Sequence, residues 1–85
     1  MGNEDLITNL ETFKIRVTGM NIYAFNQNIE QFKSEIEEIA DDEIRVSALN
    51  QLNEIGKCRI YFQDNSVGKI QINLVPKIQK LIDSL

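Results

Sequence analysis

The clearest hydrophobic pattern in this chain runs through residues 21–40, where bulky apolar side chains recur at alternating intervals of three and four positions. This spacing places them on one stripe of an α-helix about five turns long, and Asn21 can cap its start. The residues of the stripe are Ile22, Phe25, Ile29, Phe32, Ile36 and Ile39. We interpret the stripe as a face that packs on a sheet. A coiled-coil seam is the disfavoured alternative, because the pattern covers fewer than three heptads.

Three other stretches alternate apolar and polar residues with a period of two, which is typical of strands with one buried face. They are residues 12–18, 57–63 and 69–75. Residues 64–68 have turn composition, so the last two stretches are expected to form a hairpin in which Phe62 pairs with Ile70. The residues expected to point inward are Phe13, Ile15 and Val17, then Cys58, Ile60 and Phe62, and then Ile70, Ile72 and Leu74.

A second helix is expected over residues 43–55, because apolar residues recur there three or four positions apart. Asp41 or Asp42 can cap its start, and Gly56 is expected to stop it. Ile44, Val46 and Ala48 also alternate with other residues, as in a strand. A short strand therefore remains an alternative for the first part of this segment.

Two shorter helices are expected near the ends of the chain. The first follows a cap at Asn3 or Asp5, and the last begins at Pro76, whose missing N–H costs nothing at a helix start. The predicted order is therefore α-β-α-α-β-β-α. This is an α+β two-layer sandwich, in which a three-stranded, mostly antiparallel sheet carries helices on one face. Residues 1–85 are expected to form a single small domain.

The composition of the chain argues against a membrane-spanning or secreted protein and against non-specific binding to nucleic acid. No apolar run approaches the roughly 18 residues of a membrane-spanning helix, and residues 1–5 do not resemble a secretory signal. The single cysteine, Cys58, cannot form an internal disulfide, so we expect a cytoplasmic protein. The net charge of −4 argues against non-specific attraction to nucleic acid or to anionic membranes.

An enzyme is not expected. The chain has no histidine, Cys58 is expected to be buried and inert, and the four glycines are isolated, so they form no phosphate-binding loop. No cofactor and no metal site are expected. Glu35, Glu38 and Asp42 share a helix face, but they lack the spacing of an EF-hand or of a Glu-x-x-His pair.

Acidic residues are concentrated in one part of the chain. Residues 21–43 hold seven acids and one base, whereas the remaining residues hold six acids and eight bases. Asp41, Asp42 and Glu43 are suited to the start of the second helix. Glu35, Glu37 and Glu38 lie near the end of the preceding helix, where negative charges interact unfavourably with the helix dipole. The predicted partner-binding residues are Glu35, Glu37, Glu38, Asp41, Asp42 and Glu43.

We therefore predict a non-catalytic protein-binding module, a small acidic inhibitor, immunity-type or regulatory protein that docks on a basic surface of another protein. One alternative is a nucleic-acid-binding domain that uses the polar face of the sheet. The residues expected on that face are Lys14, Arg16, Lys57, Arg59, Tyr61 and Lys69. Another alternative is a structural subunit that forms a homodimer through its sheet.

Overall fold

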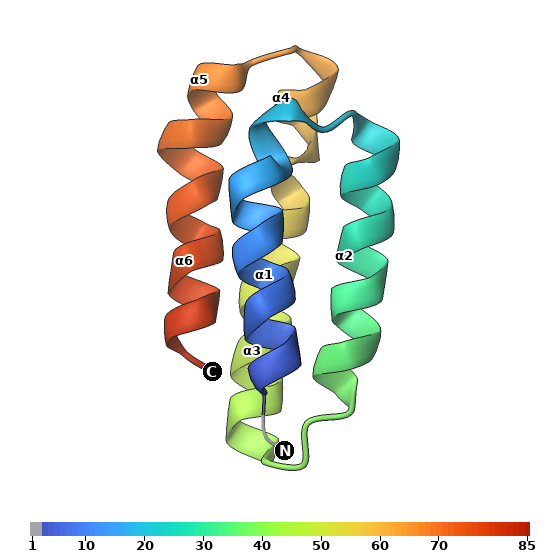
Figure 1. The fold of residues 1–85 in the computed structure, drawn as a ribbon, viewed down its shortest axis with the longest axis vertical. Coiled ribbons are helices and arrows are strands. Elements are labelled where there is room, and N and C mark those ends of the chain that lie inside the picture. Colours follow the sequence, from blue (N-terminus) through green and yellow to red (C-terminus); the bar gives the residue numbers. More distant parts are fainter. Residues whose placement is uncertain (1–2) are drawn as a thin grey trace.

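The computed structural model describes residues 3–85, which form four helical rods and contain no strand (Figure 1). The first rod joins α1 (Glu4–Arg16) to the 3₁₀ turn η1 (Val17–Gly19), and the second is α2 (Ile22–Glu37). The third rod comprises α3 (Asp42–Gly56), η2 (Lys57–Arg59) and α4 (Ile60–Gln63). The fourth comprises α5 (Val67–Lys69), the π-helical turn η3 (Ile70–Leu74) and α6 (Val75–Asp83). The predicted α+β sandwich is therefore wrong.

The rods run alternately up and down, as in a four-helix bundle (Figure 1). α1 packs against α2 and α6, and α3 packs against the same two helices. The bundle measures 37 × 20 × 19 Å along its principal axes. We call the end with the start of α1 and the loop of residues 38–41 the lower end. The opposite end, with the turn of residues 64–66, is the upper end.

The core lies along the bundle axis and receives side chains from all four rods. Phe25 is fully buried, stacks on Phe62 with ring centroids 4.4 Å apart, and also contacts Phe13. Phe13 in turn meets Phe32 edge to face at 5.2 Å. The apolar stripe of the central helix is thus core, as predicted, but it packs against other helices rather than against a sheet.

The three predicted strands are helical for a common physical reason. Each predicted strand has three residues that were expected to point inward. The first and third of each set are buried, but the middle one is exposed: Ile15 by 76%, Ile60 by 52% and Ile72 by 73%. Residues i and i+4 share a face on a helix as well as on a strand, so alternation over seven residues does not separate the two structures. The hydrophobic pattern over a longer segment does distinguish a helix from a strand. The first and third residues of each set continue a series of buried residues spaced three or four positions apart.

The helix predictions that rest on local capping are confirmed. The Ala24 N–H donates to Asn21 Oδ1 at 2.8 Å, and the Ile44 N–H donates to Asp41 Oδ1 at 3.0 Å. Residues 42–56 are helix throughout, so the alternative strand is wrong. α3 ends at Gly56, where the stop was predicted, but Gly56 has a helical φ of −59° and the third rod continues through η2 and α4 to Gln63.

The ends of the chain depart from the prediction in length. The first helix continues through residues 12–18, and Asn3 precedes it without a capping side-chain hydrogen bond. Pro76 lies in the first turn of α6, as expected, although helical structure already begins at Val67. The turn between the last two rods covers residues 64–66 rather than the predicted 64–68, and Asn65 adopts a φ of 54° there. Residues 1 and 2 of the segment inspected for a secretory signal lie outside the described part of the chain.

Candidate functional site

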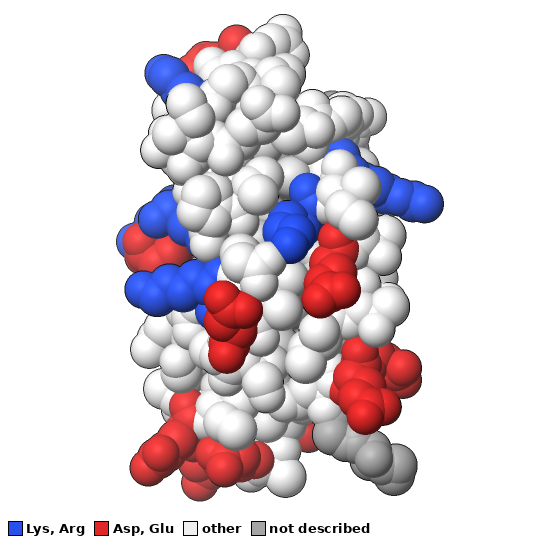
Figure 2. Space-filling model, turned by 60° about the vertical axis from the view of Figure 1, so that its left-hand side comes forward, with Lys and Arg blue, Asp and Glu red and all other residues white. Residues whose placement is uncertain are grey.

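The predicted acidic residues gather at the lower end of the bundle, where red side chains are concentrated in Figure 2. The last turn and the C-cap of α2 supply three of them, and the N-cap and first turn of α3 supply the other three. The start of α1 adds Glu4 and Asp5, which the sequence analysis did not include. Their proximity follows from the antiparallel path of α1 and α2, and no local pattern in the sequence indicates it. We call this group of eight residues the acidic end.

On the α3 side, two of the acidic side chains have structural partners. Asp41 caps α3, and Asp42 forms an ion pair with Arg45. Arg45 also donates a hydrogen bond to the Ile39 carbonyl at 2.8 Å, so it holds the loop between α2 and α3 in place. The first turn of α3 is favourable for Asp42 and Glu43, because the helix dipole is positive there. This half of the acidic end is therefore largely explained by the fold.

On the α1–α2 side, the carboxylates surround a shallow hollow of about 320 Å³, which we call the acidic hollow. Asp5, Glu35 and Glu38 line it, and no lysine or arginine does. Glu35 Oε1 accepts a hydrogen bond of 3.4 Å from Asn9, but its Oε2 is buried and receives none from residues 3–85. A buried carboxylate oxygen without a donor is unfavourable.

The position of these carboxylates at the end of α2 is a second unfavourable contribution to the stability of the fold. α2 has no basic residue in its last turn, and its C-terminal dipole is repelled by carboxylates there. Among residues 3–85, the ion pairs are Asp42–Arg45 and Glu54–Lys57, so the acidic residues at the end of α2 take part in neither. These are Glu35, Glu37 and the C-cap Glu38. Glu37 shares a hollow with Lys33 and Arg59, but no lysine or arginine lines the hollow of Glu35 and Glu38.

The residues predicted to bind nucleic acid do not share a face, because the sheet that would have aligned them does not exist. Lys14 donates to Gln79 between α1 and α6, whereas Arg16 lines a hollow between α1 and α2. Arg59 lines a hollow between α2 and α3, and Tyr61 lies beside α6. The other two residues of the set are Lys57, which is paired with Glu54, and Lys69, which is exposed on α5.

The chemistry of the remaining candidates is limited. Cys58 is buried as predicted, although it lies on a helical turn, and burial raises the pKa of its thiol. Its Sγ lies 3.7 Å from the Glu54 carbonyl oxygen. Residues 3–85 contain no group of three or more histidine, cysteine, aspartate or glutamate side chains arranged to hold a metal ion.

The fold and the site therefore define a small four-helix bundle with an acidic end. No protein-family model, curated protein or solved structure matches this chain. Within residues 3–85, no helix is both long enough and apolar enough to cross a membrane.

Proposed function

We propose that this bundle is a non-catalytic protein-binding module, an acidic inhibitor, immunity-type or regulatory protein that docks its acidic end on a basic surface of a partner protein. The observation that carries the proposal is the buried, donor-free Oε2 of Glu35 in a hollow that Asp5 and Glu38 also line. A lysine or arginine side chain from a partner that enters this hollow would offset the charge of all three carboxylates.

The charge layout supports the same role. Acidic side chains concentrate at one end of a 37 Å bundle, while the cations on the face shown in Figure 2 lie mainly around its middle. Such a separation produces a field that orients an approaching basic protein and accelerates association at low salt. Affinity would then come from groups around the acidic hollow that are desolvated on docking.

The test compares two triple variants with the same change in charge. E35Q/E37Q/E38Q removes the α2 part of the acidic end, and E11Q/E30Q/D64N removes three exposed acids elsewhere. Each tagged protein is incubated at low salt with a lysate of the source organism, and the captured proteins are identified by mass spectrometry. We expect the wild type and the control triple to capture the same basic protein, and E35Q/E37Q/E38Q to lose it.

Two outcomes would contradict the proposal. One is equal capture by both triple variants, and the other is capture of nucleic acid in place of a protein. Far-UV circular dichroism on all three proteins shows whether each is folded, so that loss of binding is not confused with loss of structure.

A further inference from the structure

α6 is shorter than α3, and this difference leaves one side of α3 open. α6 ends at Asp83, and the Gln51 amide donates across to Ser84 Oγ at 3.0 Å, so the two helices stay in contact up to that point. Below it, α3 continues without α6 beside it for about 12 Å to Glu43, at 1.5 Å per residue. The resulting hollow measures about 700 Å³ and is bounded by α3 and by Lys80. We call it the α3–α6 hollow.

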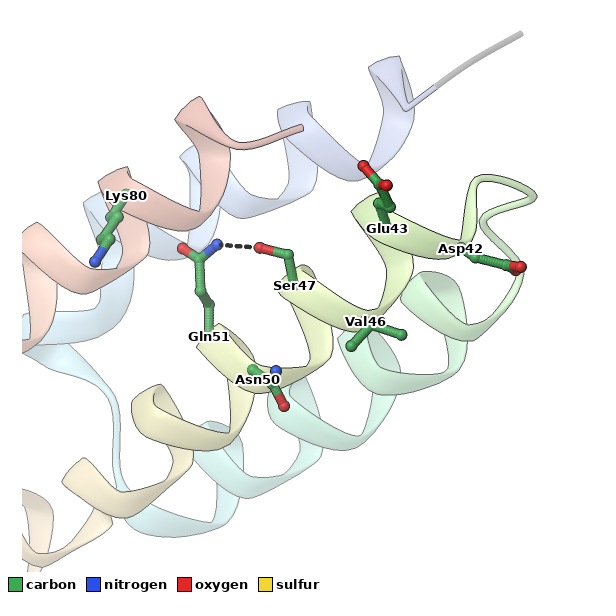
Figure 3. Close-up of a pocket in the computed structure, with 7 residues that line it drawn as sticks. All are labelled: Asp42, Glu43, Val46, Ser47, Asn50, Gln51 and Lys80. Atoms are coloured by element: carbon green, nitrogen blue, oxygen red, sulfur yellow. Dashed lines mark hydrogen bonds between the residues drawn. The ribbon is translucent and has the colours of Figure 1, made fainter.

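The two ends of this surface carry opposite charges. Figure 3 shows Glu43, Ser47 and Gln51 projecting from α3 toward the side from which Lys80 projects on α6, whereas Val46 and Asn50 project away. Lys80 lines the α3–α6 hollow, and Lys77, which lies above it on α6, lines a neighbouring hollow together with Lys80 and Tyr61. Neither lysine takes part in an ion pair among residues 3–85, and the same holds for Glu43.

The axial positions of these charges are symmetric about the contact between Gln51 and Ser84. Glu43 lies eight residues, or about 12 Å, below that contact, and Lys77 lies seven residues, or about 10.5 Å, above it. Lys80 lies about 6 Å above the contact, and Ser47 lies about 6 Å below it. A surface with this arrangement is complementary to itself when a second copy is turned upside down.

We propose that a second copy of this chain docks on the α3–α6 hollow in an antiparallel, two-fold symmetric dimer. The upper part of α6 of each protomer, which carries Lys77, lies over the hollow below the end of the partner's α6. Lys77 of one protomer then faces Glu43 of its partner, and the same pair forms a second time by symmetry. The antiparallel orientation also keeps the two acidic ends at opposite ends of the dimer, where their repulsion is smallest.

The α3–α6 surface and the acidic hollow lie on opposite sides of the bundle, because α3 and α6 pack against each other and α1 and α2 do the same. The dimer leaves the acidic hollow free, because Asp5, Glu35 and Glu38 lie on the α1–α2 side. The dimer engages Glu43 of the acidic end but leaves its α1 and α2 residues free, so dimerisation goes beyond the proposed function and does not depend on it.

Charge reversal at one pair provides a direct test. In a K77E or an E43K homodimer, both symmetric pairs become repulsive, so each variant should dissociate. In an equimolar mixture of the two variants, the heterodimer has two attractive pairs, so dimerisation should return. The matched controls are E30K and K33E, which make the same charge changes at exposed positions on α2.

The measurement is sedimentation equilibrium at low salt over about 10 μM to 1 mM protein. We expect a wild-type dimer, at least a roughly tenfold rise in Kd for each single variant, and recovery to within about threefold in the mixture. E30K, K33E and E35Q/E37Q/E38Q should dimerise like the wild type. A monomeric wild type at 1 mM, single variants that match the controls, or no recovery in the mixture would overturn the proposal.

Discussion

Glu54 and Lys57 form an ion pair of 2.8 Å on the exposed side of the third rod, where α3 passes into η2. The hydrogen bond from Lys57 lowers the pKa of the Glu54 carboxyl, and the positive charge of Lys57 acts in the same direction. Because the folded state has the lower pKa, ionised Glu54 stabilises the fold at neutral pH. That contribution is lost as the pH falls through the lowered pKa.

The pH dependence of an E54Q variant tests this assignment. We expect E54Q to have a slightly lower free energy of unfolding than the wild type at pH 7, because the glutamine side chain is uncharged. The difference should shrink as the pH falls below the ordinary pKa of a glutamate and vanish below the lowered pKa of the folded state, where the wild-type carboxyl is protonated in both states. Urea titrations of both proteins between pH 7 and pH 3 measure it; a difference that stays constant with pH would contradict the ion-pair explanation.

Cys58 illustrates a residue whose environment was predicted correctly from an incorrect secondary structure. It is only 5% exposed, and its pKa is raised because the thiolate would lose hydration in the core. The inward direction was inferred from alternation in a strand. On the helical rod it follows instead from the positions of Ile55 and Phe62, which are buried on the same face.

Among the helices, α2 shows how an element can fold well and still carry an unfavourable end. Its start is capped by Asn21, and its stripe supplies Phe25, Phe32 and Ile36 to the core. Its last turn holds carboxylates against the negative end of the dipole. The favourable terms are those that fold the bundle, and the unfavourable term lies in the acidic end, where we propose that a partner docks.

The three exposed isoleucines distinguish a helical bundle from a sandwich by experiment. Alanine is a better helix former than isoleucine, so I15A, I60A and I72A should each change the free energy of unfolding by less than about 0.5 kcal/mol. In a sandwich the same residues would be core, and each substitution would cost about 2–5 kcal/mol. F25A serves as the core control, with an expected loss of about 3–5 kcal/mol.

Urea unfolding at low protein concentration measures these variants in the monomer. Losses above about 2 kcal/mol for the isoleucine variants would contradict the helical assignment. The outcome depends on burial rather than on partner binding, so it tests the fold independently of both functional proposals.

Across the whole bundle, the uneven distribution of charge makes stability depend on salt. At about 10 mM salt the Debye length is about 30 Å, so the carboxylates of the acidic end repel one another; at about 150 mM it falls to about 8 Å. We expect the free energy of unfolding to rise over this range. E37Q/E38Q should show a smaller rise and, at low salt, a gain of about 0.3–1 kcal/mol per residue.

The matched control for this prediction is E11Q/E30Q, which removes two exposed acids away from the lower end. It should retain the salt dependence of the wild type. An equal response of the two double variants would mean that the acidic end is not the source of the repulsion. Thermal unfolding followed by circular dichroism at both salt concentrations provides the comparison.

Local interactions could be inferred from the residues alone. Each cap, at Asn21 and at Asp41, depends on a side chain and on the backbone N–H three residues later. α2 is long enough for the spacing of its apolar residues to indicate a helix unambiguously. The α2 and α3 parts of the acidic end were likewise predicted, because their residues are close in sequence. Each of these features involves interactions within a few residues of one another, which a linear pattern represents directly.

The features that depend on contacts between distant segments could not be inferred in this way. Whether Ile15, Ile60 and Ile72 face the core or the solvent depends on where the other rods lie. The same is true of Asp5, which joins Glu35 only because α1 and α2 are antiparallel. The buried oxygen of Glu35 and the open side of α3 arise from packing between rods, so only the three-dimensional arrangement reveals them.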